Sequence, residues 1–151
     1  MGLFRPRPKE KGNKGTQGAE TEAIIEAELI RAGYTVLRPN GYMHRYDLAI
    51  EDADGNFWKL QCKTAWPIED GACLVFATTS LQQAGQRGRK ISVRKTYTND
   101  VHYFAVYSPY TGKVYLVPIE ETAKSFSRLR LTPATKNGQQ KRIKYAADYE
   151  L

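Results

Sequence analysis

Residues 45–65 have the sequence RYDLAIEDADGNFWKLQCKTA, which predicts two antiparallel strands joined by a tight turn. The strands are expected over 45–50 and 57–65, and the Asp-Gly pair between them is a strong hairpin signal. Because side chains alternate between the two faces of a strand, Gln61 and Lys63 share one face. The other face, which we expect to be buried, carries Trp58, Leu60 and Cys62.

The predicted hairpin brings the carboxylate of Asp47 close to Gln61 and Lys63 on the neighbouring strand. A lone carboxylate among apolar neighbours is costly unless a cation or hydrogen bonds compensate its charge. A carboxylate, an amide and an ammonium beside an apolar wall therefore form a candidate site for a cation and a charged substrate. In the alternative interpretation, Asp47 caps a turn at a strand end and Lys63 is a surface residue paired with it.

A helix is predicted over residues 17–32, because Ile25, Leu29 and Ala32 recur on one face and Gly33 forms a natural stop. Proline, lysine and arginine alternate in the segment before it, which has little to bury, so residues 1–14 are expected to be a flexible basic arm and residues 15–151 a single domain.

Glu22 is the residue that we expect to bring a second carboxylate to the site. It lies three residues before Ile25 and seven before Leu29, which predicts that it shares their inward face. Glu20 is the next candidate, and Glu26 borders the same face. The alternative is that these acids only satisfy the positive end of the helix dipole.

The rest of the chain predicts an α/β fold, with a central mixed β-sheet flanked by helices. Residues 66–71 are expected to form a turn, 80–99 a long irregular loop and 119–126 a second, short helix. Loops as long as 80–99 are often functional. Further strands are expected over 35–39, 72–78, 101–107 and 113–118.

The formal net charge is +7, and the basic residues form clusters. Such clusters favour a polyanion as the partner, because each phosphate contact releases condensed counterions. The plainer alternative is that they keep the protein soluble. The five basic residues expected to bind DNA all lie in the predicted loop: Arg87, Arg89, Lys90, Arg94 and Lys95.

The sequence contains no apolar run long enough to span a membrane and no signal-peptide pattern at its N-terminus, so we expect a cytoplasmic protein. Cys62 and Cys73 are then expected to be reduced thiols. Neither they nor His44 and His102 have the close spacing of a zinc site. His102 precedes an aromatic pair. A histidine in such a position is more often a packed residue than a catalytic one.

Two motifs resemble the core of the PD-(D/E)XK nuclease superfamily. Tyr46-Asp47-Leu48 stands where that pattern has its Asp, and Gln61-Cys62-Lys63 stands where it has an acid, any residue and Lys. The order of the other elements over residues 13–151 is also similar, and the Gln-x-Lys motif resembles the group I intron homing endonuclease branch. The chain departs from the commonest pattern at Gln61, an amide that carries no charge.

The resemblance implies a catalytic set of Asp47, Gln61, Lys63 and Glu22. It also implies a Mg²⁺ ion, for which Mn²⁺ can substitute, held by Asp47, Glu22 and the main-chain carbonyl of Cys62. The position of Glu22 before Gly33 matches the helix Glu of similar proteins. The implied products are a 5′-phosphate and a 3′-hydroxyl.

These observations predict a Mg²⁺-dependent endonuclease that cuts both strands of double-stranded DNA at specific sites, as homing enzymes do. Because one small domain offers one active site, we expect a homodimer or a homotetramer. A structure-selective nuclease that resolves Holliday junctions or acts in repair is the first alternative. A DNA-binding module that has lost catalysis is the second, and the amide at Gln61 keeps it open.

Overall fold

The computed structural model describes residues 12–86, 89–134 and 143–151, and only the backbone of residues 83–86 and 89–90. Its elements in chain order are α1 (Lys14–Arg31), β1 (Thr35–Leu37), β2 (Leu48–Glu51), β3 (Phe57–Thr64), β4 (Trp66–Ile68), β5 (Cys73–Ala77), β6 (Thr79–Gln86), β7 (Arg89–Thr96), β8 (Tyr103–Ser108), β9 (Lys113–Pro118), the 3₁₀ turn η1 (Ile119–Glu121), β10 (Phe126–Arg130) and the 3₁₀ turn η3 (Ala146–Asp148).

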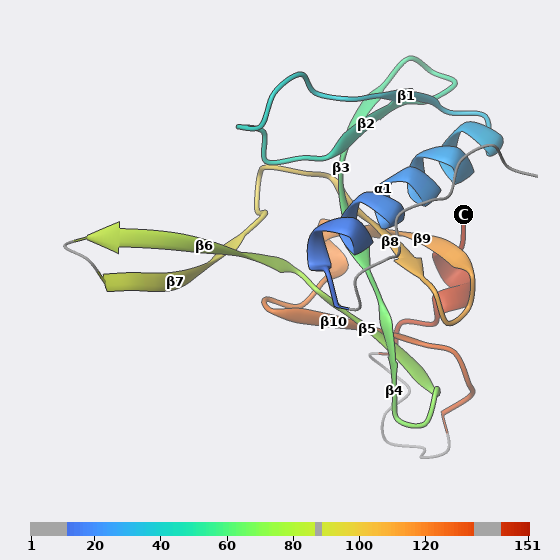
Figure 1. Ribbon diagram of the computed structural model, residues 1–151. Helices are drawn as coiled ribbons and strands as arrows, with labels where there is room; N and C mark the ends of the chain where they lie inside the picture. Colours follow the sequence, from blue (N-terminus) through green and yellow to red (C-terminus); the bar gives the residue numbers. More distant parts are fainter. Residues whose placement is uncertain (1–11, 87–88, 135–142) are drawn as a thin grey trace, which may run out of the picture.

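The central sheet has the strand order β1-β2-β3-β8-β9 (Figure 1). The predicted hairpin forms β2 and β3, which pair antiparallel with Leu48 opposite Leu60. Strand β3 pairs parallel with β8, whereas all other neighbours in this sheet are antiparallel. The sheet is therefore mixed, as the sequence predicts, and the hairpin lies at its centre.

Helix α1 covers one face of this sheet (Figure 1). The side chain of Asn13 caps its N-terminus by accepting hydrogen bonds from two backbone N–H groups. The buried face of α1 carries Thr21, Ile25 and Leu29, and the last two pack on Leu60 and its neighbours in the sheet. The helix begins at Lys14, three residues earlier than predicted, and most of the predicted basic arm, residues 1–11, lies outside the described residues.

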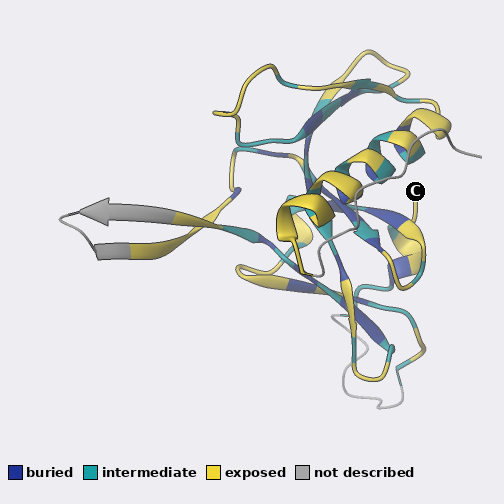
Figure 2. Ribbon diagram, viewed as in Figure 1, coloured by how far each residue is buried: buried dark blue, intermediate teal, exposed yellow. Residues whose placement is uncertain are grey.

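A second, smaller sheet with the order β10-β5-β4 covers the opposite face. Its apolar side chains join those of β8 and β9 in a core that includes Phe76, Phe104 and Leu129. Figure 2 shows the buried stretches concentrated where the central sheet meets these two layers. The α/β arrangement is confirmed, but within the described residues α1 is the one α-helix that flanks the sheet.

The predicted irregular loop over residues 80–99 is wrong, because most of this stretch forms the antiparallel strands β6 and β7. The two strands pair with each other from Thr79–Thr96 to Gln86–Arg89. We call this hairpin the arm, and it projects away from the rest of the molecule (Figure 1). Its backbone groups satisfy one another, so no buried face is needed and the apolar alternation that predicts a strand is absent.

Two further predictions are wrong for local reasons. The predicted helix over 119–126 stops after the 3₁₀ turn η1, where the hydroxyl of Thr122 donates to the carbonyl of Ile119. The chain then enters β10, which buries Ser127 and Leu129 against β5. The predicted turn over 66–71 begins as the edge strand β4, a position that tolerates a proline.

We expect Phe104→Ala to lower the free energy of unfolding by about 3–5 kcal/mol, as large-to-small core changes do. Phe104 is fully buried between the rings of Phe76 and Tyr97. The control is Phe126→Ala, whose ring is 51% exposed and whose loss is expected to cost roughly 1 kcal/mol or less. Urea unfolding followed by circular dichroism gives both values, and equal losses would contradict this packing.

Candidate active site

The candidate site lies where strand β2 begins beside β3. Asp47 directly precedes β2, and its backbone N–H extends the ladder by donating to the carbonyl of Leu60 at 2.9 Å. On the N-terminal side of this bond, no described residue of the chain pairs with β3 in the β2–β3 ladder. The edge of β3 from Gln61 to Lys63 is therefore open to side chains on that side.

The carboxylate of Asp47 fills this opening. Its Oδ2 atom accepts a hydrogen bond from the backbone N–H of Cys62 at 2.7 Å and another from the side-chain amide of Gln61. The structure thus brings Asp47 and Gln61 together, as the sequence predicts, but Gln61 directs its NH₂ group toward the carboxylate. Both hydrogen bonds fall on one oxygen of Asp47, which leaves its Oδ1 atom as the better metal ligand.

Asp47 and Glu22 form a pair of carboxylates whose negative charges repel each other. Burial raises the pKa of Asp47 above its ordinary value, while the Cys62 N–H and the charges of Lys63 and Arg38 act in the opposite direction. Burial also raises the pKa of Glu22, and the negative charge of Asp47 adds to the effect. Two carboxylates with raised pKa values side by side indicate a place where a cation is favourable.

Glu22 occupies the margin of the buried face of α1 rather than its centre. Its side chain is 37% exposed and lies 3.7 Å from the guanidinium of Arg38 at the end of β1. Arg38 also pairs with Glu26. The alternative acid, Glu20, lines a small pocket beside Trp66 on another side of the helix.

The residues fit a divalent cation in the number and kind of their ligands. Within a strand, the N–H and C=O of one residue point to the same side, so the carbonyl of Cys62 faces the opening that Asp47 fills. Asp47, Glu22 and this carbonyl are oxygen donors of the kind that Mg²⁺ prefers, and Mg²⁺ requires few carboxylates. Among the described residues no group of three or more His, Cys, Asp or Glu side chains gathers in a metal-binding arrangement, so the oxygen set depends on the backbone.

Lys63 contacts the base of the arm. Its ammonium lies 3.3 Å from the carbonyl of Thr79 and 3.3 Å from the hydroxyl of Tyr97, and 4.7 Å from the centre of the Tyr97 ring. Burial lowers the pKa of Lys63, whereas the negative charge of Asp47 acts against this change. The lysine is thus held close to the carboxylates without a direct ion pair to Asp47 among the described contacts.

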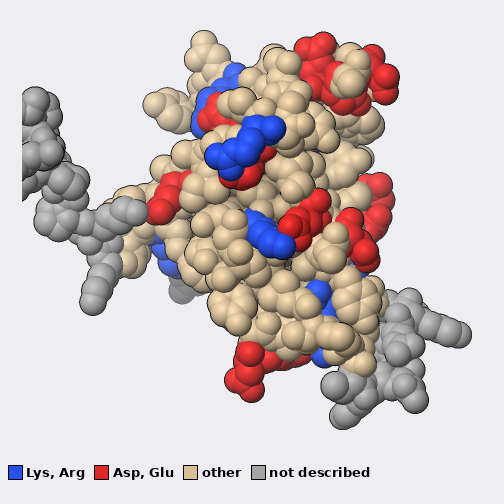
Figure 3. All heavy atoms as spheres, turned by 90° about the vertical axis from the view of Figure 1, so that its right-hand side faces the viewer, with Lys and Arg blue, Asp and Glu red and all other residues tan. Residues whose placement is uncertain are grey.

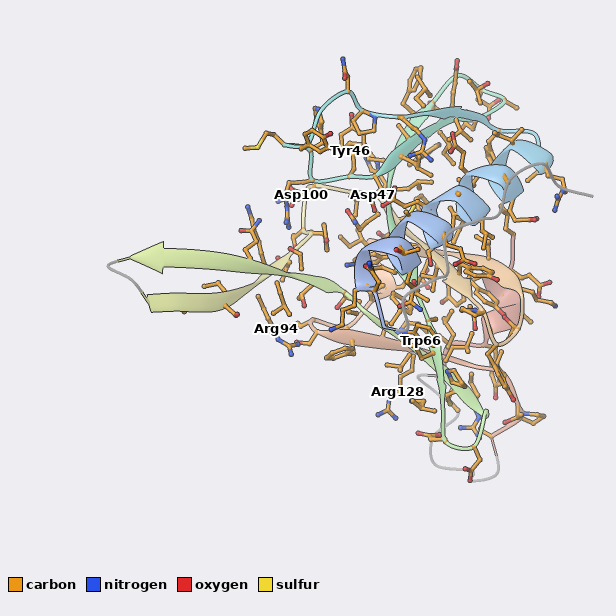
Figure 4. The ribbon with its side chains drawn as sticks, viewed as in Figure 1. Tyr46, Asp47, Trp66, Arg94, Asp100 and Arg128 are labelled. Atoms are coloured by element: carbon orange, nitrogen blue, oxygen red, sulfur yellow. The ribbon has the colours of Figure 1, made fainter. Side chains whose placement is uncertain are left out.

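The register of the arm separates two of the predicted DNA-binding residues. Directly opposed residues of an antiparallel pair share a face, and Ser80 is opposite Lys95. The hydroxyl of Ser80 accepts a hydrogen bond from Arg45, so Lys95 lies on the face of the arm nearest the site. Arg94 stacks 5.4 Å from the ring centre of Phe126, on the opposite side of the arm from the site (Figure 4).

Arg87 lies outside the described residues, and of Arg89 and Lys90 only the backbone is described, paired within β7.

The two histidines have structural contacts. His102 accepts a hydrogen bond from the backbone N–H of Lys59 through Nδ1, and its ring packs edge-on against Trp58. His44 bonds to the carbonyl of Asn40. Cys62 and Cys73 are buried free thiols, as predicted from the sequence.

Three residues near the site were missed by sequence reasoning: Arg38, Arg45 and Tyr97. Arg38 and Arg45 flank the loop that leads into Asp47, and each is a lone basic residue within a predicted strand. That position was the available signal for them. Tyr97 is one of ten tyrosines, and nothing in its local sequence distinguishes it from the others.

Comparison of the chain with known protein families identifies its family. Residues 12–151 match the family described as PD-(D/E)XK endonuclease. The chain belongs to the PD-(D/E)XK endonuclease family. Membership makes it a nuclease, and the Asp47 and Gln61-Cys62-Lys63 motifs occupy the adjacent strands β2 and β3 or their immediate margin.

The fold of this PD-(D/E)XK protein also resembles a solved structure, that of a bacterial homing endonuclease, I-Ssp6803I. The TM-score is 0.68, and the match covers 92% of this chain and 89% of that chain at 22% sequence identity. The likeness confirms the fold. A search of curated proteins found no match.

We expect Mg²⁺ to raise the melting temperature of the protein near about pH 7 and to do so less near about pH 4.5. The raised pKa values mean that the folded protein binds protons at Asp47 and Glu22 more tightly than the unfolded chain. Stability therefore falls as pH rises above the ordinary values of 3.8 and 4.5, and a cation offsets that loss. Differential scanning fluorimetry measures the shift.

Asp47→Asn is the control for this measurement. It keeps the shape of the side chain but removes one of the two charges, so the Mg²⁺-dependent shift should disappear and the metal-free protein should become less sensitive to pH. An equal Mg²⁺ shift in the wild type and in Asp47→Asn would contradict the assignment of this site.

Proposed function

We propose that this nuclease is a Mg²⁺-dependent DNA endonuclease that hydrolyses phosphodiester bonds, with Mn²⁺ able to replace Mg²⁺. The observation that supports it best is the Asp47 carboxylate, fixed by the Cys62 N–H at 2.7 Å in the open edge of β3. Near it are a second carboxylate and a half-buried ammonium. A nuclease needs these charges: carboxylates to hold a metal cation, and a positively charged side chain to face the phosphate.

Each residue then has a distinct role. Asp47, Glu22 and the carbonyl of Cys62 hold the cation, which when bound supplies positive charge that polarises the scissile phosphate and helps water to ionise. Lys63 orients the attacking water and offsets the charge that develops on the phosphate oxygens. Gln61 holds Asp47 in place through its amide.

Double-stranded DNA is the substrate that best fits the arm. Each of its strands has eight residues, which extend about 26 Å at 3.3 Å per residue. The major groove of B-DNA admits a two-stranded ribbon. The arm also carries the basic cluster that includes Lys95, and it begins directly at the residues that contact Lys63.

The opposite side of the molecule offers a different surface. Figure 3 shows the right-hand face of Figure 1, where Asp and Glu side chains are interspersed with Lys and Arg over the described residues. A polyanion is repelled by such acids, so this charge pattern favours the arm side for nucleic acid. No helix in the described part of the chain has the length and apolar character to cross a membrane.

Homing-type cleavage at a specific site is the finer part of the proposal. A cut through both strands needs two active sites, so a homodimer or homotetramer follows from it, working in the cytoplasm. A Holliday junction resolvase would cut branched DNA in preference to linear DNA regardless of sequence. An inactive DNA-binding module would bind the duplex and leave it intact.

We expect purified protein to cut duplex DNA in Mg²⁺ and not in EDTA, with Asp47→Ala and Lys63→Ala each losing at least about a hundredfold in rate. Both variants should still bind DNA, because the arm is unchanged. Plasmid nicking and linearisation measure the rates, and filter binding measures affinity. Normal cleavage by Asp47→Ala would exclude this site as the catalytic one.

A separate expectation concerns the two faces of the arm. Lys95→Ala should weaken duplex binding and flatten the plot of log affinity against log salt by about one unit if one phosphate contact is lost. Arg94→Ala removes the same charge from the opposite face and is the matched control, with little change in the slope. A larger effect at Arg94 would place the DNA on the Phe126 side of the arm.

A further inference from the structure

Arg45 joins the base of the arm to the segment that leads into the site. Its guanidinium donates to the carboxylate of Asp100 at 3.0 Å, to the hydroxyl of Ser80 at 3.0 Å and to the carbonyl of Thr96 at 2.6 Å. Ser80 lies at the start of β6 and Thr96 at the end of β7. One side chain therefore fixes both strands of the arm where they leave the body of the molecule.

The aromatic ring of Tyr97 contacts two cations. The guanidinium of Arg45 stacks 4.5 Å from its centre, and the ammonium of Lys63 lies 4.7 Å from the same centre. Tyr97 is 5% exposed and packs edge-on against Phe104 in the core. A cation near an aromatic face is stabilised by the ring, and more strongly when water is excluded.

The contacts of Lys63 come from the same place. Among the described contacts, its ammonium donates to the carbonyl of Thr79, the first residue of the arm, and to the hydroxyl of Tyr97, the residue that directly follows the arm. The charge of Arg45 also lowers the pKa of Lys63, in the same direction as its burial. The position of the ammonium therefore depends on how the arm is seated.

We propose that Arg45 and Tyr97 are positioning residues that couple the seating of the arm to the placement of the Lys63 ammonium in the site. This inference rests on the proposed function, because it assigns Lys63 to the cleavage step and the arm to DNA. DNA that engages the arm acts through this contact on the lysine that faces the scissile phosphate. Asp100 neutralises Arg45 and so allows two cations to share one ring.

A plainer reading is that Arg45 only stabilises the fold, as a partly buried ion pair can. Its side chain is 23% exposed and that of Asp100 30%. Under that reading, loss of Arg45 lowers stability and leaves the environment of Lys63 unchanged in the molecules that remain folded. The two readings differ in what happens at Lys63, which can be measured directly.

The first experiment observes Lys63 without DNA. The ε-methylene signal of Lys63, in protein labelled with ¹³C-lysine and assigned by its loss in Lys63→Arg, should be shifted upfield by the Tyr97 ring. In Arg45→Met, which keeps chain length but removes the guanidinium, the signal should move toward the position of an exposed lysine. Arg128→Met is the matched control, because Arg128 joins Glu69 far from the site (Figure 4) and should leave the signal in place.

The second experiment measures single-turnover cleavage at saturating enzyme. We expect Arg45→Met to lose about tenfold or more in the rate constant while DNA affinity changes less, which marks a loss in the transition state. Arg45→Lys keeps the charge but not the three hydrogen bonds and should restore only part of the rate. Asp100→Asn keeps the size of its side chain and should show a smaller loss of the same kind.

An unchanged Lys63 signal in folded Arg45→Met would overturn the proposal, whatever its melting temperature. A cleavage rate constant equal to that of the wild type would also overturn it. If the wild-type protein cut no DNA, the proposed function would fail, and the Lys63 signal would still decide whether Arg45 and Tyr97 place the lysine.

Discussion

The hydrogen bond from the Cys62 N–H to the Asp47 carboxylate is the interaction on which the site depends. Strand β2 begins at Leu48, opposite Leu60, so its backbone does not reach Cys62 and the Asp47 side chain bonds to the Cys62 N–H instead. A buried N–H without a partner is costly, and this bond satisfies it. The carboxylate is thereby fixed next to the Cys62 carbonyl, so the central sheet itself would determine the position of the proposed cation.

The amide at Gln61 has a physical reason that follows from this bond. Asp47 and Glu22 already repel each other, as their raised pKa values indicate. A third carboxylate at position 61 would face the oxygen that now accepts the amide hydrogen and would raise the free energy of the metal-free protein. Gln61 donates instead, so the site stays ordered with fewer charges. The positive charges of Arg38 and Lys63 provide the remaining compensation.

The sequence predicts the features that short-range patterns determine. Alternation and the Asp-Gly turn place the β2–β3 hairpin, and with it the approach of Asp47 to Gln61. The arm was missed because its strands pair with each other and its described side chains are mostly exposed, so no apolar period marks them. Arg45 and Asp100 are 55 residues apart in the chain, and no local pattern indicates that they meet. Glu22 was predicted on the inward face, whereas the structure places it at that face's margin, where its charged side chain stays partly exposed to solvent.

Residues at the base of the arm have two demands to meet: they must pack against the core and also contact the arm. In the proposed site Lys63 lies near Asp47, yet one of its hydrogen-bond partners, Thr79, belongs to the hairpin that projects from the molecule. Such a hairpin has few contacts with the body and can shift relative to it unless its base is held. Tyr97 meets both demands, because its ring packs on Phe104 in the core while its hydroxyl and face contact Lys63. The lysine of the proposed site is thus contacted by a core aromatic residue at the base of the arm.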